Sequence, residues 1–497
     1  MPGWPAARSP ERRAPRESRP AGGGLSTAGV RINRATSSFI SITAAVLPPG
    51  PRAPRALQTA RWIARPAAFM EDAQRRYGDM FTLRIANEGT WVFISHPHAV
   101  KQVFTGDPRL LHAGEANIVL LPVLGGHSVL LLDDDAHMAH RKLMLPPFHG
   151  ERMRGYEQTM GEVAAREIER WPAGEPLAAW PTMQTITLEV IMRTVFGVQE
   201  SGRLERLGDV LRNLLAFAAR PARMAFLAVF GPRRVAELGL VRSVVEPADE
   251  LIYEEIRARR DAPDLAERDD VLSLLLQARH DDGTPMSDLE LRDELMTLLV
   301  AGHETSATAL AWALDALTHH PHTLARLRDE VDSGDETYLD AVIKETLRLR
   351  PVIALVLRRL VEPMEIGGRT LPTGVNVAPC VYLLHRRADV YDDPRAFRPE
   401  RFLNKPPGTY TWIPFGGGVR RCLGASFAQF EMKVVLRELV SRLDVGAARP
   451  EPERRVRRAI VFAPARGGEI VVKGSNRASA RAARSAPPRP SARSALR

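Results

Sequence analysis

The residues best suited to chemistry lie in the stretch FGGGVRRCLG, which contains Cys422. A cysteine beside arginines and ahead of a helix can be held as a thiolate, because both features favour an anion. Gly418 and Gly424 have no side chains, so a ring system can approach the backbone there. Phe415 can shield the sulfur from water, and Arg420 can bind a carboxylate. The stretch is typical of a site where a large, flat, anionic cofactor lies against a thiolate.

A helix is expected to follow this loop and position it. Apolar residues recur at helical spacing over residues 423–443, directly after Cys422. The alternative is a buried structural cysteine behind a loop, which is the usual role of a lone cysteine. The spacing F-x-x-G-x-R-x-C-x-G argues against that alternative, because it constrains several positions at once.

This spacing resembles the haem-binding loop of the cytochrome P450 monooxygenases, and the likeness extends over roughly residues 47–473. The resemblance implies haem b with Cys422 as the axial ligand of its iron, and O2 as co-substrate. It places Phe415, Gly418 and Gly424 around the haem and Arg420 at a haem carboxylate. A thiolate ligand donates electron density to the iron and favours cleavage of an O–O bond.

A second segment, AGHET, lies within a long helical pattern and contains Glu304 and Thr305. Gly302 can leave room for a ligand, while the Thr305 hydroxyl can loosen the helix by bonding a backbone carbonyl. The segment is similar to the oxygen-binding groove of the same family, which includes Ala301 and Gly302. That similarity makes Thr305 the alcohol beside O2 and Glu304 the acid that supplies protons. The alternative is a buried glycine-containing helix with Glu304 facing solvent; His303 receives no role.

His137 and Arg141 are four residues apart, so they share one face of a helix. The family places such a pair against a haem propionate, together with Arg420 and an arginine of the early β region. That arginine is Arg358, although the neighbouring Arg359 could take its place if the register slips. The alternative for His137 and Arg141 is a solvated, charged helix.

Glu345 and Arg348 form an E-x-x-R pair on one helical face, which alone would be an exposed ion pair of little energetic value. The segment FRPERF, which contains Arg401, follows before the cysteine loop. In the family, the arginine of such a segment joins the helix pair. We therefore expect Glu345, Arg348 and Arg401 to form a buried scaffold with no catalytic role.

The net charge of +10 is confined to the ends of the chain. Residues 1–50 carry +5 and residues 474–497 carry +6, so the middle of the chain is close to neutral at −1. This distribution argues against a nucleic-acid-binding body. We expect a disordered basic extension over 1–46, one domain over 47–473 and a disordered basic tail over 474–497. Alternatives are an electrostatic tether and, for the N-terminus, a start assigned too far upstream.

The fold is expected to be mainly α with a minor β region, as in the cytochrome P450 fold. Helical patterns dominate the chain, and short strands are expected at 80–85, 91–95, 364–366, 369–371 and 375–377. Only two cysteines are present, so no disulfide framework is expected. No apolar run reaches the ~20 residues that span a bilayer. We expect a cytoplasmic monomer without a transmembrane segment.

The segments expected to line the substrate pocket are apolar, among them residues 118–121, 352–356 and 460–462. A hydrophobic substrate such as a lipid, sterol or terpenoid is therefore favoured. The resemblance implies electrons from a ferredoxin-type donor with an NAD(P)H-dependent reductase. Two alternatives stay open: a peroxide-driven or non-oxygenating haem-thiolate enzyme, and a non-catalytic haem-binding protein.

Overall fold

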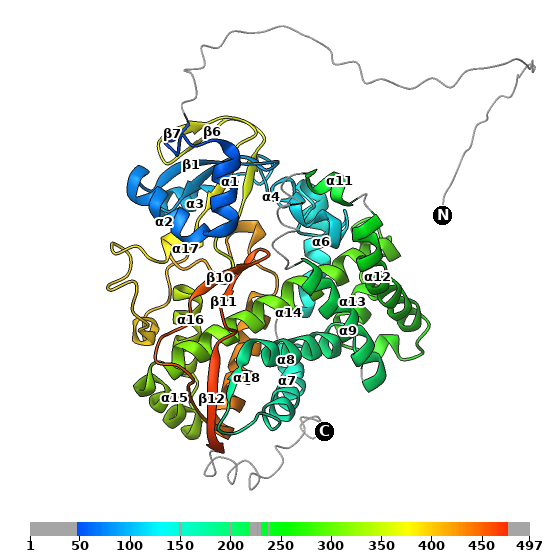
Figure 1. Ribbon diagram of the computed structural model, residues 1–497. Helices are drawn as coiled ribbons and strands as arrows, with labels where there is room; N and C mark the ends of the chain where they lie inside the picture. Colours follow the sequence, from blue (N-terminus) through cyan, green and yellow to red (C-terminus); the bar gives the residue numbers. More distant parts are fainter. Residues whose placement is uncertain are drawn as a thin grey trace, which may run out of the picture. The chain divides into compact units, whose positions relative to one another are not determined.

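The computed structural model describes residues 47–148, 152–198, 200–218, 226, 230–236 and 239–475. The expected extension over 1–46 and nearly all of the expected tail over 474–497 lie outside these residues. The described residues belong to one compact unit. Its longest helix is α14 (Asp288–Thr318), which crosses the middle of Figure 1. Ser287 and Glu290 cap its N-terminus through reciprocal hydrogen bonds, which satisfy amides that the helix leaves free.

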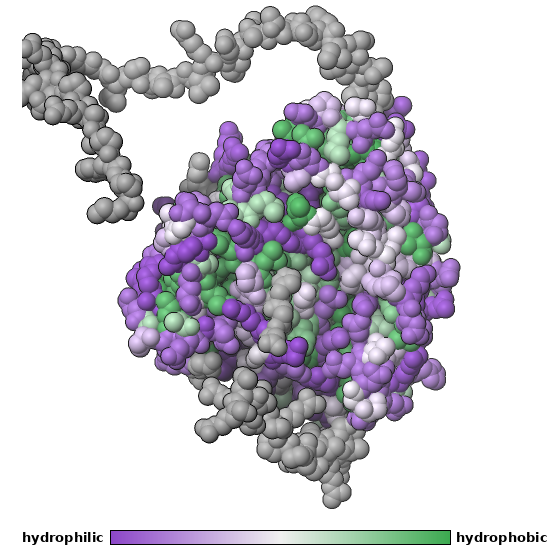
Figure 2. Space-filling model, turned by 180° about the vertical axis from the view of Figure 1, so that it is seen from behind, coloured by the Kyte–Doolittle hydropathy of each residue, from purple (hydrophilic) through white to green (hydrophobic). Residues whose placement is uncertain are grey.

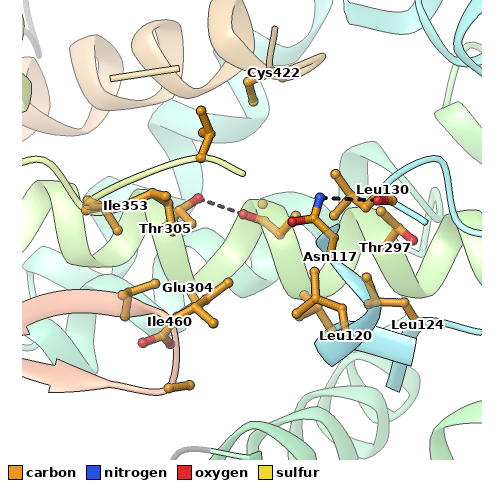
Figure 3. A pocket seen from close by; sticks show the side chains of 18 of the residues that line it. Asn117, Leu120, Leu124, Leu130, Thr297, Glu304, Thr305, Ile353, Cys422 and Ile460 are labelled. Carbon is orange, nitrogen blue, oxygen red and sulfur yellow. Dashed lines mark hydrogen bonds between the residues drawn. The ribbon is translucent and has the colours of Figure 1, made fainter. Parts of the chain in front are cut away.

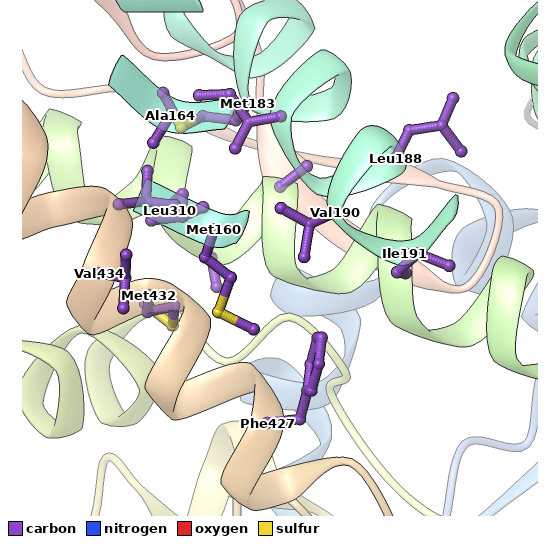
Figure 4. Close-up of a cluster of buried hydrophobic side chains, with 14 of the residues drawn as sticks. Met160, Ala164, Met183, Leu188, Val190, Ile191, Leu310, Phe427, Met432 and Val434 are labelled. Atoms are coloured by element: carbon purple, nitrogen blue, oxygen red, sulfur yellow. The ribbon is translucent and has the colours of Figure 1, made fainter. Parts of the chain in front are cut away.

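The main core lies between α14 and three other helices, α7 (Arg152–Ile168), α8 (Ala179–Thr194) and α18 (Ala425–Arg442). Figure 4 shows side chains from these helices meeting, with Met160, Leu310 and Phe427 pointing into one cluster. Helix α14 is apolar on nearly all sides, which is the pattern of a helix enclosed by others. This packing fixes α14, which carries Glu304 and Thr305, and α18, which begins directly after the loop of Cys422.

A five-stranded sheet has the order β1-β2-β8-β5-β3. Strands β1 (Met80–Ile85) and β2 (Gly89–Ile94) pair antiparallel, and β2 pairs with β8 (Asn376–Pro379) in parallel. Strand β5 (Arg358–Leu360) joins β8 to β3 (Leu111–His112). Consecutive residues are buried in both β1 and β2, because side chains on both faces of this sheet pack into apolar clusters.

Three smaller sheets complete the β structure. Strands β6 (Met364–Ile366) and β7 (Arg369–Leu371) form the predicted hairpin. Strands β10 (Arg455–Arg458) and β11 (Val461–Pro464) form a second hairpin, while β12 (Glu469–Ser475) lies between β4 (Pro176–Ala178) and β9 (Leu443–Ala447). The expectation of a mainly helical fold with minor sheets is confirmed.

The remaining helical elements connect these parts. Among the described residues, no helix is both long enough and apolar enough to cross a bilayer. In Figure 2, polar residues cover most of the face shown, and apolar residues gather in patches between them. The other elements are α1 (Arg55–Ala64), α2 (Pro66–Tyr77), α3 (Pro97–Thr105), α4 (Ala113–Ala116), η1 (Ile118–Leu120), α5 (Leu121–Leu124), α6 (Asp134–Met144), η2 (Pro146–Phe148), α9 (Ser201–Ala218), α11 (Pro232–Ala236), α12 (Gly239–Arg260), η3 (Leu265–Glu267), α13 (Val271–Gln277), α15 (Pro321–Ser333), α16 (Thr337–Leu349), α17 (Val381–Leu384), η4 (Pro399–Phe402) and η5 (Gly418–Arg420).

Candidate functional site

A cavity of about 1040 Å³ lies beside α14, and Cys422 forms part of its wall. Most of the other lining residues are apolar, and they come from α5, α14, the segment before β5 and the β10–β11 hairpin. Figure 3 shows Cys422 on one side of this space and Ile460 on the other, with Thr305 and Ile353 between them. Such a volume and lining are typical of a small-molecule site.

The loop that carries Cys422 is held in a conformation that requires glycine. Gly416 and Gly418 both have φ of +67°, and a Cβ at Gly418 would meet the carbonyl oxygen of Phe104 at 2.2 Å. The Cys422 amide donates to the Phe415 carbonyl over 3.0 Å, which closes the loop. At Gly424 a Cβ would meet nothing within 4 Å, because this position faces the open cavity. The loop therefore presents a bare backbone around the sulfur.

Two opposing effects act on the pKa of the Cys422 thiol. Desolvation in the cavity wall raises this pKa above its usual value, while the Gly424 amide, Arg421 and Arg141 lower it by less. Helix α18 begins at Ala425, so Cys422 lies before its first turn. The two arginines therefore act on the thiol in the predicted direction, and desolvation opposes them.

Four basic side chains reach the cavity wall near Cys422: His137, Arg141, Arg358 and Arg420. His137 and Arg141 lie on α6, as the spacing predicted. His137 is 3% exposed, and no hydrogen bond to its ring is found within the described residues. Arg420 donates to Asp133 Oδ1 over 2.5 Å, in addition to two backbone carbonyls. Asp133 is the only acidic residue that forms a hydrogen bond with any of these four side chains in the described structure.

Neighbouring positive charges and burial make the protonated forms of these basic groups less stable. Burial and the charges of Arg420, Arg141 and Arg358 lower the pKa of His137 to about 3. Burial, with the charge of Arg420, lowers the pKa of Arg358 to about 10. The three arginines place more positive charge in one wall than Asp133 alone compensates, while His137 is neutral near pH 7 and can donate a hydrogen bond. Two carboxylates on the edge of a flat group would provide the remaining compensation, which matches the expected haem.

The choice between Arg358 and Arg359 is made by the sheet. Successive residues of β5 point to opposite faces, so only one of the two can reach the cavity. Arg358 is 6% exposed and lines the cavity. Arg359 is directed outward to Glu115, at 3.3 Å. The structure therefore places Arg358, and not its neighbour, with the other three basic groups.

Ala301, Gly302, Glu304 and Thr305 all line the cavity from α14. Thr305 Oγ1 donates to the Ala301 carbonyl over 2.6 Å, yet α14 continues without a break. A Cβ at Gly302 would lie 2.8 Å from Ile191 Cδ1, so the missing side chain also lets α8 pack close to α14. Room for a ligand at Gly302 stays a prediction, and this glycine lines the cavity.

Glu304 has a partner that sequence reasoning missed. Gln184 Nε2, on α8, donates to Glu304 Oε2 over 2.8 Å. Burial raises the pKa of Glu304 to about 7, against the lowering effects of Gln184 and Arg458. A carboxyl that titrates near neutral pH can both accept and release protons. No pattern around Gln184 distinguishes it from other polar residues of a core helix, so no sequence signal pointed to it.

Glu345, Arg348 and Arg401 are brought together behind the cysteine loop. Arg348 donates from Nε to Glu345 Oε2 over 2.6 Å and from Nη2 to Oε1 over 2.8 Å. Arg401 Nε reaches the same Oε1 at 3.1 Å. Glu345 and Arg348 are both 0% exposed. The set lies outside the cavity wall, as expected for a scaffold.

The chain is similar in sequence and in structure to known proteins of one family. It matches the sequence model of the family described as Cytochrome P450 over residues 47–468. It is 44% identical over 443 residues to cytochrome P450 135B1 of Mycobacterium tuberculosis, covering 87% of this chain and 93% of that protein. Cytochrome P450 137 of the same species is 38% identical over 434 residues, covering 85% and 90%. Retinoic acid-bound cyanobacterial CYP120A1 has a similar structure, with a TM-score of 0.76 at 25% identity over 86% of this chain and 99% of that one.

Proposed function

Because the chain belongs to the cytochrome P450 family of haem monooxygenases, we propose that it inserts one oxygen atom from O2 into a hydrophobic small molecule, such as a lipid, sterol or terpenoid. The electrons come from a separate ferredoxin-type protein and its NAD(P)H-dependent reductase. The cofactor is haem b, and the enzyme acts as a cytoplasmic monomer.

The observation that carries this proposal is the placement of Cys422 and four basic groups in the wall of one apolar cavity. The residues present fit haem in two respects. His137, Arg141, Arg358 and Arg420 lack enough anionic partners among the described residues, which two propionates would supply. The open space at Gly424 is where any side chain would obstruct a flat ring.

The chain's own residues would divide the work between binding and proton supply. Haem, when bound, supplies the iron at which O2 is activated. Cys422 would ligate that iron, and the basic groups would bind the propionates. From α14, the Thr305 hydroxyl would offer a hydrogen bond, and Glu304 would exchange a proton near neutral pH. The apolar walls exclude bulk water from the reacting carbon.

The proposed substrate class and electron donor both fit the surfaces that they would contact. Leu120, Leu124, Ile353 and Ile460 point into the cavity from three directions in Figure 3. An apolar molecule would gain most from such walls. The side chain of Arg421 is exposed next to Cys422. A positive group there suits an acidic redox protein.

Two spectroscopic and kinetic measurements test the proposal. Reduced, haem-loaded protein with carbon monoxide is expected to show the red-shifted Soret band of thiolate ligation. A band at the ordinary wavelength in folded protein would remove Cys422 as ligand. Turnover of hydrophobic compounds with a surrogate ferredoxin and reductase under O2, compared with peroxide alone, then separates a monooxygenase from a peroxide-driven enzyme. Binding without turnover in either case would indicate a non-catalytic haem protein.

A further inference from the structure

The cavity contains a second polar region, formed by Glu88 and Arg457. Glu88 belongs to the turn between β1 and β2, and Arg457 to strand β10. Arg457 lies three residues before Ile460 in the same hairpin, and Figure 3 shows Ile460 across the cavity from Cys422. This region is therefore separate from the basic groups that surround the cysteine.

Arg457 is held in one orientation but keeps part of its hydrogen-bonding capacity. Its Nε donates to the Ala459 carbonyl over 2.7 Å, and its Nη1 to the Trp62 carbonyl over 3.2 Å. The guanidinium also lies over the Trp62 ring, 5.2 Å from its centroid. No hydrogen bond from Nη2 and no carboxylate at ion-pair distance is found in the described part of the chain. A fixed cation with a free donor thus faces the cavity.

Glu88 provides an acceptor in the same region. Its backbone carbonyl accepts a hydrogen bond from Asn376 Nδ2 at 2.8 Å, which fixes the turn to β8. Its carboxyl has no hydrogen-bond partner among the residues that the structure describes. Burial raises the pKa of this carboxyl to about 7, and Arg457 is the charge that opposes the shift. Glu88 and Arg457 interact electrostatically, but no ion pair between them is found among the described residues. Each therefore keeps a hydrogen-bonding atom available for a bound molecule.

A hydroxyl group matches this arrangement better than an ion does. Its oxygen can accept from Arg457 while its O–H donates to Glu88. A carboxylate would be repelled by ionised Glu88, and a quaternary ammonium would be repelled by Arg457. We propose that the cavity binds an elongated apolar molecule whose hydroxyl group lies between Glu88 and Arg457, at the end away from Cys422. This inference rests on the proposed function and defines its substrate class as an alcohol with a long apolar body.

The test measures how tightly four probes of equal chain length bind to haem-loaded protein at pH 8, where Glu88 is ionised. Dissociation constants for 1-decanol, its methyl ether, decanoate and decyltrimethylammonium are measured by calorimetry. The alcohol is expected to bind about tenfold tighter than the ether, because only the alcohol can donate to a charged acceptor. Decanoate and the ammonium probe are expected to bind more weakly than the alcohol.

Two variants assign the preference to these residues. Glu88→Leu is expected to reduce the alcohol-to-ether ratio to about one, because the acceptor for the hydroxyl is lost. Arg457→Met is expected to weaken binding of both probes, because both oxygens can accept from Arg457, and to leave the ratio above one. Glu115→Gln, an exposed acid paired with Arg359, is expected to leave the ratio unchanged. Because both affinities are measured on the same protein, a partial folding defect affects them equally.

The outcomes separate this inference from the proposed function. Equal affinity of alcohol and ether in the unmodified protein would overturn the inference alone, as would tightest binding of decanoate or of the ammonium probe. A preference that survives Glu88→Leu would overturn it as well, as would unchanged affinity of both probes in Arg457→Met. Failure of every probe to bind would overturn the inference together with the proposed hydrophobic substrate. Loss of the thiolate signature with carbon monoxide would instead refute the proposed haem ligation.

Discussion

The buried carboxylate of Glu345 offers the sharpest test of how the scaffold behind the cysteine loop is held. It accepts four hydrogen bonds: two from Arg348, one from Arg401 Nε and one from the Arg398 amide at 2.8 Å. The change Glu345→Gln keeps the shape of the side chain but removes its charge. It also points an N–H donor at groups that are donors themselves.

The expected loss of stability in Glu345→Gln follows from the contacts that Arg348 keeps and the one that it loses. Its Nη1 still donates to the carbonyls of His385 and Pro394, and its Nη2 to that of Ala396. Its positive charge, however, is 0% exposed and has lost its counter-ion. Breaking a buried pair in this way costs about 3–5 kcal/mol. That is a large part of the ~5–15 kcal/mol by which domains are usually stable.

The assay is urea unfolding of the haem-loaded protein, followed by far-UV circular dichroism. Glu400→Gln is the matched control, since Glu400 is a neighbouring acid with a half-exposed side chain. It lies 3.5 Å from Arg326 and accepts a hydrogen bond from the Tyr338 hydroxyl. An exposed ion pair of this kind contributes about 1 kcal/mol or less.

The reasoning would be refuted if Glu345→Gln lowered the free energy of unfolding by no more than the control does. A second check is the double variant Glu345→Met with Arg348→Met, which replaces the pair by apolar groups of similar volume. We expect it to be less destabilised than the sum of its single changes, because the fully buried charges of Glu345 and Arg348 are then removed together.

Three further predictions concern the cavity. Thr305→Ala should leave haem content unchanged but divert reducing equivalents to hydrogen peroxide. Thr318→Ala, on the same helix, should not increase peroxide formation. Equal coupling in both variants would contradict the role of Thr305. Gln184→Leu removes a hydrogen bond that lowers the pKa of Glu304, which is about 7 with the bond in place. The infrared band of the protonated carboxyl should therefore persist to higher pH, and a midpoint that stays or falls would argue against this contact. Gly424→Val places a side chain in the open space beside the sulfur, so haem per chain should fall severalfold while circular dichroism is preserved, and full haem loading would show that the ring lies elsewhere.

Short-range patterns in the sequence were sufficient for several features. The spacing around Cys422 identified the loop, and the i, i+4 spacing of His137 and Arg141 placed both on one helical face. The turn Gly367-Gly368 between two short apolar runs predicted the β6–β7 hairpin. Each of these features depends on backbone geometry over a few residues, which local residue types encode directly.

Only the tertiary structure decided which groups are buried together. The pleat of β5 selected Arg358 over Arg359, and α8 supplied Gln184 to Glu304 from 120 positions away. Gly302 lies close to Ile191 of α8, a contact that no local pattern indicates. Desolvation opposes the effect of the neighbouring arginines on the pKa of Cys422, and it depends on every atom around the sulfur. Burial and long-range charge are sums over the whole fold, so a linear pattern does not contain them.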